Sequence, residues 1–321
     1  MIQKEILLKA SGKNYGYKSP PLFVPFKKVE TWSLTAKKNY YENLRNICIK
    51  RKKHSTGSSK FVAFIAPLFR NFPIEIRGAE NLIDANVLFS GNHSNSHDVF
   101  IIKEVFRKLK RKISPLVAYD GLNSLSRTFF FMSDGTFIDR ADKKSIENGL
   151  VDFCSKILKG SDGFMFGEST WNLHPLLPMQ KLKAGITLVS LITGKPIIPV
   201  IFEYVESAQI CKKESSLYDK CIVQFGTPYY VTTDKNIFEQ TYKLQIIMEN
   251  MRRKLWDELG IRKDSFENIN KELYLNHLYL KKFKATGFKY NSELETQFLL
   301  NKENEYIINQ NGEFVPGILQ R

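Results

Sequence analysis

Residues 88–98 read Leu-Phe-Ser-Gly-Asn-His-Ser-Asn-Ser-His-Asp. The apolar start of this stretch predicts a short strand that ends at Gly91 and leads His93 into a polar turn, with Asp98 five positions further on. A histidine that leaves a strand end with a carboxylate within reach of its ring is typical of a general base with its orienting partner. The stretch therefore predicts a buried strand and a candidate catalytic pair, His93 and Asp98.

Short apolar runs of the same kind recur along the chain, and helical patterns lie between several of them. The runs that predict strands are 74–76, 87–89, 116–119, 136–138, 164–166, 197–202 and 222–225. Helical spacing covers 98–111, 143–159 and 181–193, and a longer helix closes the pattern near Gly260. Strands that alternate with helices predict a mixed α/β layer structure with a largely parallel sheet.

The pattern divides the chain into three parts. Residues 1–72 form a basic, amphipathic N-terminal segment, in which 31–50 has helical spacing. Residues 73–260 hold all the predicted strands and are expected to be the catalytic domain. Residues 261–321 are more polar and form a C-terminal appendage with a hairpin near Asn311-Gly312.

Composition narrows the class of protein. The chain has 321 residues, of which 43% are hydrophobic and 25% charged, as expected for a folded protein with a large core. No apolar run approaches the roughly 20 residues that a membrane-spanning helix needs. The first residues lack the pattern of a signal peptide, so we expect no export. The four cysteines are scattered without a CxxC pair, which favours a reducing, cytoplasmic compartment over a disulfide framework or a zinc site.

The charge is concentrated near the N-terminus. The formal net charge is +15, and residues 1–80 hold 16 Lys and Arg against 5 Asp and Glu. The basic run 50–53 precedes the aromatic-rich apolar stretch 61–69, a combination typical of a peripheral protein on an anionic bilayer. A solvated basic face followed by a core helix is the alternative reading. Because no nucleic-acid-binding fold is recognisable, nucleic acid is not an expected partner. We expect peripheral association with the inner face of a membrane.

Four segments in a fixed order make the His-x4-Asp pair more specific than it is alone. The first block is Asn92-His93 with Asp98, and the second is Gly-Thr-Phe-Ile-Asp-Arg, 135–140. The third is Phe-Gly-Glu-Ser-Thr-Trp-Asn, 166–172, and the fourth is Lys-Pro-Ile-Ile-Pro-Val, 195–200. Together they resemble the blocks of the glycerolipid acyltransferases of the PlsC type, which include 1-acylglycerol-3-phosphate acyltransferase. The resemblance covers about residues 74–230.

The resemblance implies a glycerol-phosphate-acyltransferase-like fold and an activity. A fatty acyl group would pass from an acyl-CoA or acyl-carrier-protein thioester to a hydroxyl of a lysophospholipid-like acceptor, with no cofactor and no metal. His93 would be the general base and Asp98 its orienting carboxylate. The substrate-binding residues that it implies are Arg140, Glu168, Ser169, Thr170 and Trp171. Arg140 would hold an acceptor phosphate and Glu168 would fix the loop facing His93, although a surface ion pair and a purely structural role are the alternatives.

The third block departs from the family pattern at Trp171. The family usually carries Gly-Thr-Arg where this chain has Ser169-Thr170-Trp171. Indole cannot replace arginine as a phosphate ligand, but it offers a stacking face that suits sugars. The acceptor is therefore either a lysophospholipid or a sugar hydroxyl of a lipid-linked or envelope glycan. Lys181 and Lys183 are further candidates for phosphate contacts.

The residues raise three other readings: different roles for the histidines, a serine hydrolase, and a protein without catalytic activity. His93 and His97 stand four apart, as two metal ligands on a helix would, and His97 is also an alternative base. A serine hydrolase is disfavoured because the segment beginning at Gly167 fails the Gly-x-Ser-x-Gly pattern at its last position. The third reading is a non-catalytic membrane-binding protein on the same scaffold.

Overall fold

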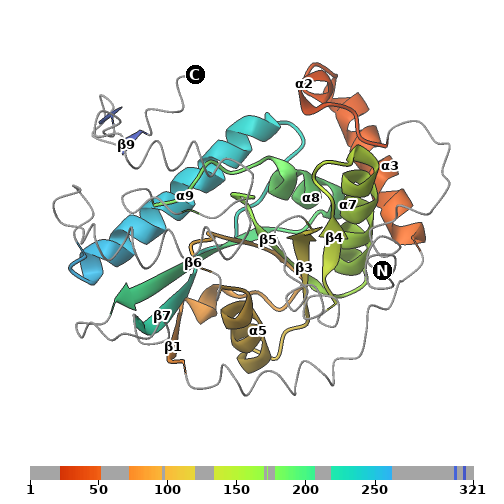
Figure 1. Cartoon of the computed structure of the whole chain (residues 1–321). Coiled ribbons are helices and arrows are strands. Elements are labelled where there is room, and N and C mark those ends of the chain that lie inside the picture. The colour runs from red at the N-terminus through yellow and green to blue at the C-terminus, as the bar shows by residue number, and fades with distance from the viewer. Residues whose placement is uncertain are drawn as a thin grey trace.

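The computed structural model describes residues 22–51, 72–95, 98–119, 134–169, 172, 178–206, 218–261, 307–308 and 314–315. Within these ranges a seven-stranded sheet has the order β1-β7-β6-β2-β5-β3-β4 (Figure 1). Its strands are β1 (Ile74–Arg77), β2 (Leu88–Gly91), β3 (Ile113–Ala118), β4 (Thr136–Ile138), β5 (Asp162–Phe166), β6 (Ile197–Glu206) and β7 (Tyr218–Phe225).

The sheet is mixed and largely parallel, which confirms the fold class predicted from the sequence. Strands β6, β2, β5, β3 and β4 run parallel to one another, whereas β7 pairs antiparallel with β6. β1 then pairs parallel with β7 at the edge. Because β2, β5 and β4 share one direction, the segments that follow them emerge at the same edge of the sheet.

Helices cover both faces of the sheet (Figure 1). One face is covered by α5 (Asp98–Lys108), and the other by α7 (Lys143–Leu158), α8 (Gly185–Thr193) and α9 (Ile237–Glu258). The N-terminal helices α2 (Phe26–Val29) and α3 (Leu34–Lys50) join the second layer, where α3 contacts α7 and α8. A 3-10 turn, η2 (Ala79–Asn81), follows β1.

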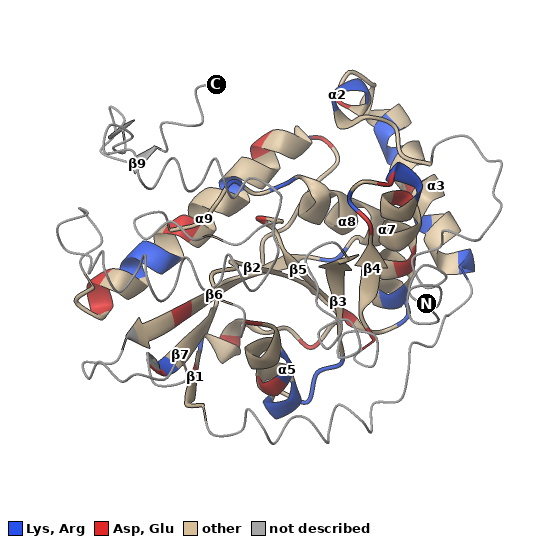
Figure 2. Cartoon of the chain, in the orientation of Figure 1, with Lys and Arg blue, Asp and Glu red and all other residues tan. Residues whose placement is uncertain are grey.

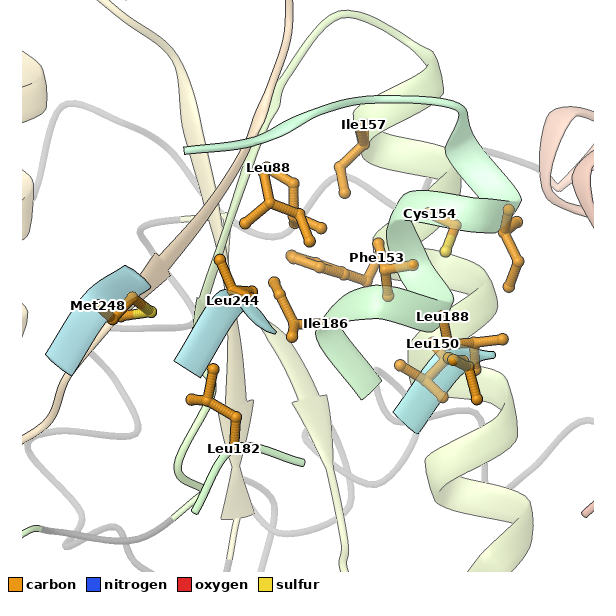
Figure 3. Packing of buried hydrophobic residues seen from close by; sticks show 14 of the residues in the cluster. Leu88, Leu150, Phe153, Cys154, Ile157, Leu182, Ile186, Leu188, Leu244 and Met248 are labelled. Atoms are coloured by element: carbon orange, nitrogen blue, oxygen red, sulfur yellow. The ribbon is translucent and has the colours of Figure 1, made fainter. Parts of the chain in front are cut away.

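Side chains of β2 alternate between the two layers, as a fully buried strand requires. Leu88 joins the core under α7, α8 and α9, whereas Val87 and Phe89 join the core under α5. Figure 3 shows Leu88 among residues of three helices, such as Phe153 and Ile186. Because β2 packs against a hydrophobic core on each face, its position is fixed. The start of the polar segment that leads to His93 is fixed with it.

Local signals set the helix ends. Ser33 caps α3 by accepting a hydrogen bond from the N–H of Ala36 at 3.3 Å, and the Asp142 side chain caps α7 in the same way. Asn236 caps α9, and Gly194 ends α8 with a φ of 66°, in the left-handed region that favours glycine. None of the helices within the described ranges is long and apolar enough to cross a membrane.

The appendage is described at two short strands. β8 (Ile307–Ile308) pairs antiparallel with β9 (Phe314–Val315), on either side of the Asn311-Gly312 turn predicted from the sequence. The turn itself lies outside the described residues, as does the apolar stretch 61–69.

Candidate active site

The end of β2 is held tightly to β6. The Asn92 amide accepts a hydrogen bond from the Phe202 N–H at 2.7 Å and donates one to the Phe202 carbonyl at 3.1 Å. Just before it, a Cβ on Gly91 would lie 2.7 Å from Cζ of Phe164, so only glycine fits between the aromatic rings there. These contacts fix the backbone that leads into His93.

His93 and Asp98 are in direct contact. Nδ1 of His93 lies 2.8 Å from Oδ2 of Asp98, the fully buried first residue of α5. The same oxygen accepts hydrogen bonds from the backbone N–H groups of Ser94 and Asn95, both at 2.9 Å. An ionised carboxylate only accepts hydrogen bonds, so Nδ1 carries the proton that faces Asp98. In the neutral ring Nε2 then keeps its lone pair, which is the state that a base needs.

The other oxygen of Asp98 is also occupied. Oδ1 accepts a hydrogen bond from the hydroxyl of Tyr204 on β6 at 2.5 Å. Among the described residues, the ring, two backbone groups and a phenol all donate hydrogen bonds to this carboxylate.

The imidazole of His93 stacks on a phenylalanine. Phe166 is the last residue of β5, and its ring lies parallel to the His93 ring with centroids 3.8 Å apart and planes at 10°. Gly91 on β2 and Phe166 are register partners, which explains why the next turn brings His93 over this ring. The His93 side chain is 14% exposed. One edge and one face of the imidazole are thus fixed by the protein.

Glu168 holds the backbone of His93 rather than its ring. Its Oε1 accepts a hydrogen bond from the His93 N–H at 2.7 Å, and its Oε2 accepts one from the Gln180 N–H at 2.6 Å. The His93 carbonyl accepts a hydrogen bond from the Asn172 N–H at 2.6 Å. Burial raises the pKa of Glu168 to about 8, although the two N–H donors act in the opposite direction.

A buried ion pair supports the far side of Glu168. Arg252 on α9 donates to Glu203 on β6 at 2.6 Å and to the Pro178 carbonyl at 2.5 Å. Pro178 lies two residues before Gln180, whose N–H bonds to Glu168. The segment that covers Glu168 is therefore fastened to both α9 and β6.

Arg140 follows β4 and reaches the loop that follows β5. Its Nη1 donates a hydrogen bond to the carbonyl of Ser169 at 2.5 Å. Ser169 has a φ of 60°, in the left-handed region that costs a residue with a Cβ about 1–2 kcal/mol. It stands where the blocks of the PlsC-type acyltransferases carry glycine, the residue that adopts this conformation most readily.

The structure brings together His93, Asp98, Glu168, Ser169 and Arg140 at the edge where β2, β5 and β4 end. Their roles stay predictions. Thr170, Trp171 and the alternative base His97 lie outside the described residues. The described part of the chain holds no group of three or more His, Cys, Asp and Glu side chains that could bind a metal ion.

Sequence reasoning missed three residues that shape this site. Phe166 is part of the third block, but nothing in that block indicates that its ring lies under His93. Tyr204 and Arg252 are separated from Asp98 and Glu168 by long stretches of chain, and no local spacing connects them. The local signal for Tyr204 is weak: it is a tyrosine just after the apolar run 197–202, and a buried phenol needs a hydrogen-bond partner.

No protein-family model matches the sequence, and no curated protein matches it. Among solved structures, the chain is similar to the crystal structure of the 1-acyl-sn-glycerophosphate (LPA) acyltransferase PlsC from Thermotoga maritima. The sequences are 13% identical, the match covers 79% of this chain and 89% of that chain, and the TM-score is 0.44. What this chain does is therefore inferred from its own residues.

Proposed function

We propose that this protein is an acyltransferase that moves a fatty acyl group from an acyl-CoA or acyl-carrier-protein thioester to a hydroxyl of a lysophospholipid-like acceptor. The observation that supports this best is the 2.8 Å contact between Nδ1 of His93 and Oδ2 of the fully buried Asp98. It leaves Nε2 as the basic atom of a partly exposed ring. The order of the four sequence blocks is the second support.

The proposed reaction needs a base and no covalent enzyme intermediate. Nε2 of His93 takes the proton of the acceptor hydroxyl while the hydroxyl oxygen attacks the thioester carbonyl carbon. The carbon–sulfur bond then breaks, and the departing thiolate takes the proton from the imidazolium, so the products are an ester and a free thiol. Asp98 stabilises the charged ring between the two proton transfers.

The acceptor class is the finer part of the proposal. Arg140 donates a hydrogen bond to the Ser169 carbonyl, and the resemblance implies that this arginine holds an acceptor phosphate, which supports a phosphate-bearing acceptor. Trp171 in place of an arginine favours a sugar-bearing acceptor instead. A lysophospholipid acceptor is proposed first, and O-acylation of a lipid-linked or envelope glycan is the alternative by the same chemistry.

The test is acceptor-dependent thiol release from long-chain acyl-CoA and from acyl-carrier protein. The acceptor panel holds lysophosphatidic acid, other lyso-lipids and glycans. Wild type is compared with His93→Ala and with His277→Ala, a control histidine in the C-terminal appendage. We expect His93→Ala to lower acceptor-dependent release by about 10³-fold or more, with circular dichroism unchanged. His277→Ala is expected to keep the wild-type rate.

Full turnover in His93→Ala contradicts the assignment of the base. Silence of the wild type with every donor and acceptor favours the alternative, a non-catalytic membrane-binding protein on this scaffold. The acceptor that stimulates release identifies the substrate class.

We also propose that the basic N-terminal segment contacts an anionic membrane surface at its cytoplasmic side. Figure 2 shows Lys and Arg positions along α2 and α3. Lys27, Lys28 and Lys38 are exposed there, and so are the aliphatic residues Leu34 and Ile47, which are 43% and 40% exposed. Lysines beside exposed aliphatic side chains suit a surface with anionic head groups over an apolar layer.

Vesicle sedimentation tests the membrane contact. We expect binding to vesicles that contain anionic lipid, weaker binding to zwitterionic vesicles, and loss of binding as salt is raised. Lys27→Glu combined with Lys28→Glu is expected to weaken binding by roughly thirtyfold or more, at about 1 kcal/mol for each lysine lost. Lys243→Glu on α9 is the matched control. Equal binding of both variants contradicts the assignment.

A further inference from the structure

Tyr204 completes the hydrogen bonding of Asp98. Its hydroxyl lies 2.5 Å from Oδ1 of Asp98, while Oδ2 receives the His93 ring and two backbone N–H groups. Asp98 is fully buried and Tyr204 is 8% exposed. A charged carboxylate in such a place is stable only when its lone pairs are satisfied, and the phenol supplies a donor to Oδ1.

The position of this phenol follows from the sheet. β6 pairs parallel with β2, and Tyr204 lies two residues beyond Phe202, where Asn92 ties the two strands together. Its ring is tilted against that of Phe72, with centroids 6.2 Å apart. Packing therefore holds the ring in addition to the hydroxyl. Tyr204→Phe removes the hydroxyl and leaves the packed ring in the core.

We propose that Tyr204 is a positioning residue for the reaction, the outer member of a hydrogen-bonded chain Tyr204–Asp98–His93. It would fix the plane of the carboxylate so that Oδ2 faces the imidazole. It would also set how much negative charge Asp98 offers to the protonated ring. The effect on turnover rests on the proposed acyl transfer, whereas the effect on the His93 ring does not.

Removing the hydroxyl has a predictable direction. Without that donor the Asp98 carboxylate is more basic and holds the protonated imidazole more strongly, so the pKa of His93 rises. The other titratable groups near the pair are the Glu168 carboxyl and the thiol of Cys221, whose pKa burial raises. The Glu168 carboxyl keeps its surroundings in the variant, whereas the Cys221 thiol loses the Tyr204 hydroxyl as a hydrogen-bond partner. Because burial raises the pKa of that thiol, it stays uncharged and adds no charge beside Asp98 in either protein.

A buried ion pair lies on the opposite face of the sheet from Tyr204, Asp98 and His93. Arg252 donates a hydrogen bond to Glu203 at 2.6 Å, whereas the Tyr204 hydroxyl donates to Asp98. Replacing the hydroxyl leaves that ion pair in place. The variant thus changes the hydrogen-bonded chain to His93 and the contact with the neutral Cys221 thiol.

The first test compares the titration of His93 in wild type and Tyr204→Phe by NMR of labelled histidine, assigned with His93→Ala. We expect the His93 ring to titrate at higher pH in Tyr204→Phe than in wild type, because the carboxylate that faces the ring has lost a donor. The low-pH limb of kcat/KM moves to higher pH by the same amount, and kcat falls about tenfold. Tyr229→Phe removes a phenol that donates to the Gln240 carbonyl at 3.0 Å and is expected to change neither quantity.

A second variant guards against poor folding of the first. Replacing Tyr204 with 3-fluorotyrosine keeps the ring and makes the hydroxyl a stronger donor, so the pKa of His93 is expected to fall instead of rise. Opposite shifts in the two variants support the chain.

The outcomes separate this proposal from the proposed function. If His93 titrates identically in wild type and both Tyr204 variants, the chain is wrong, whatever the activity. If the shifts occur but the wild type transfers no acyl group, the chain stands and the proposed function fails. A loss of stability in Tyr204→Phe without any change in the His93 titration assigns Tyr204 a structural role only and overturns the proposal.

Discussion

Asp98 and Glu168 hold the same histidine from opposite sides in different ways. Both carboxyls are buried, at 0% and 1% exposure, and both accept a hydrogen bond from His93. Asp98 binds the ring nitrogen and lies on the α5 side, whereas Glu168 binds the backbone N–H and is braced from α9. From this difference we expect Asp98 to stabilise the protonated imidazole and Glu168 to fix the position of the backbone that carries it.

The sharpest test of this comparison is Asp98→Asn. The amide cannot accept from all the donors around Oδ2, and it no longer stabilises a charged imidazole. We expect acceptor-dependent kcat/KM to fall about 10³-fold. The control is Asp142→Asn at the N-cap of α7, where asparagine caps as well as aspartate and the rate is expected to stay unchanged. Activity of Asp98→Asn within tenfold of wild type would break the comparison.

The second test uses the pH dependence of stability. Burial raises the pKa of Glu168 from about 4.5 to about 8, so between these values the folded protein holds a proton that the unfolded chain releases. The free energy of unfolding therefore falls as pH rises, by up to about 1.4 kcal/mol per pH unit from this group. Urea unfolding at several pH values measures the slope. Glu168→Gln is expected to lack this contribution, and parallel curves for the two proteins would refute it.

The third test is the same variant at mildly acidic pH. A glutamine at position 168 accepts from only one of the two N–H groups of His93 and Gln180. We expect the free energy of unfolding to drop by about 1–3 kcal/mol, with kcat lowered by tenfold or less. Glu239→Gln, at an exposed position of α9, is the matched control. A larger loss of kcat than in Asp98→Asn would reverse the roles assigned to the two acids.

The smallest expected effect concerns the residue after Glu168. Glycine adopts the left-handed φ of Ser169 without the clash of a Cβ. Ser169→Gly is expected to raise the free energy of unfolding by about 1 kcal/mol. Ser169→Ala keeps the Cβ and is expected to bring no gain. Thermal unfolding of both variants measures the difference, and equal values would show that the loop stores no strain.

Much of the fold was predictable because each strand carries an apolar run. The seven predicted strands all exist, and β4 matches its run residue for residue. The apolar run that predicts β6 ends at residue 202, yet the strand continues through Glu203 to Glu206. The reason is that Arg252 neutralises Glu203 across the helix layer, and a sequence pattern does not contain that partner.

The order of the strands and the start of α8 were not predictable in the same way. β7 lies between β1 and β6, a placement set by packing rather than by any local signal. α8 begins at Gly185 and not at residue 181, because the N–H groups of Leu182 and Lys183 bond to Gln245 and Gly167 instead of forming a helical turn. Contacts with distant segments of the chain set both the strand order and the first residue of α8.

The candidate site shows the same contrast between residues with a local sequence signal and residues placed by long-range contacts. His93 and Asp98 were identified because both lie in one stretch that leaves a strand, and Glu168 and Arg140 because they follow neighbouring strands of the same direction. The ring under His93 and the phenol that bonds to Asp98 come from strands whose sequences do not identify these partners. Contacts between distant segments therefore carry the part of the site that sequence reasoning does not reach.

The adjacent positions of Glu203 and Tyr204 make β6 intolerant of a change in length. Neighbouring strand residues point to opposite faces, so Glu203 meets Arg252 on one side while Tyr204 meets Asp98 on the other. Inserting or deleting a single residue just before this pair would exchange them. A carboxylate would then face Asp98, and a phenol would face the guanidinium. A single insertion or deletion would therefore remove the Tyr204 hydrogen bond to Asp98 and, at the same time, the Glu203–Arg252 ion pair behind Glu168. A substitution at position 203 or 204 would remove only one of the two.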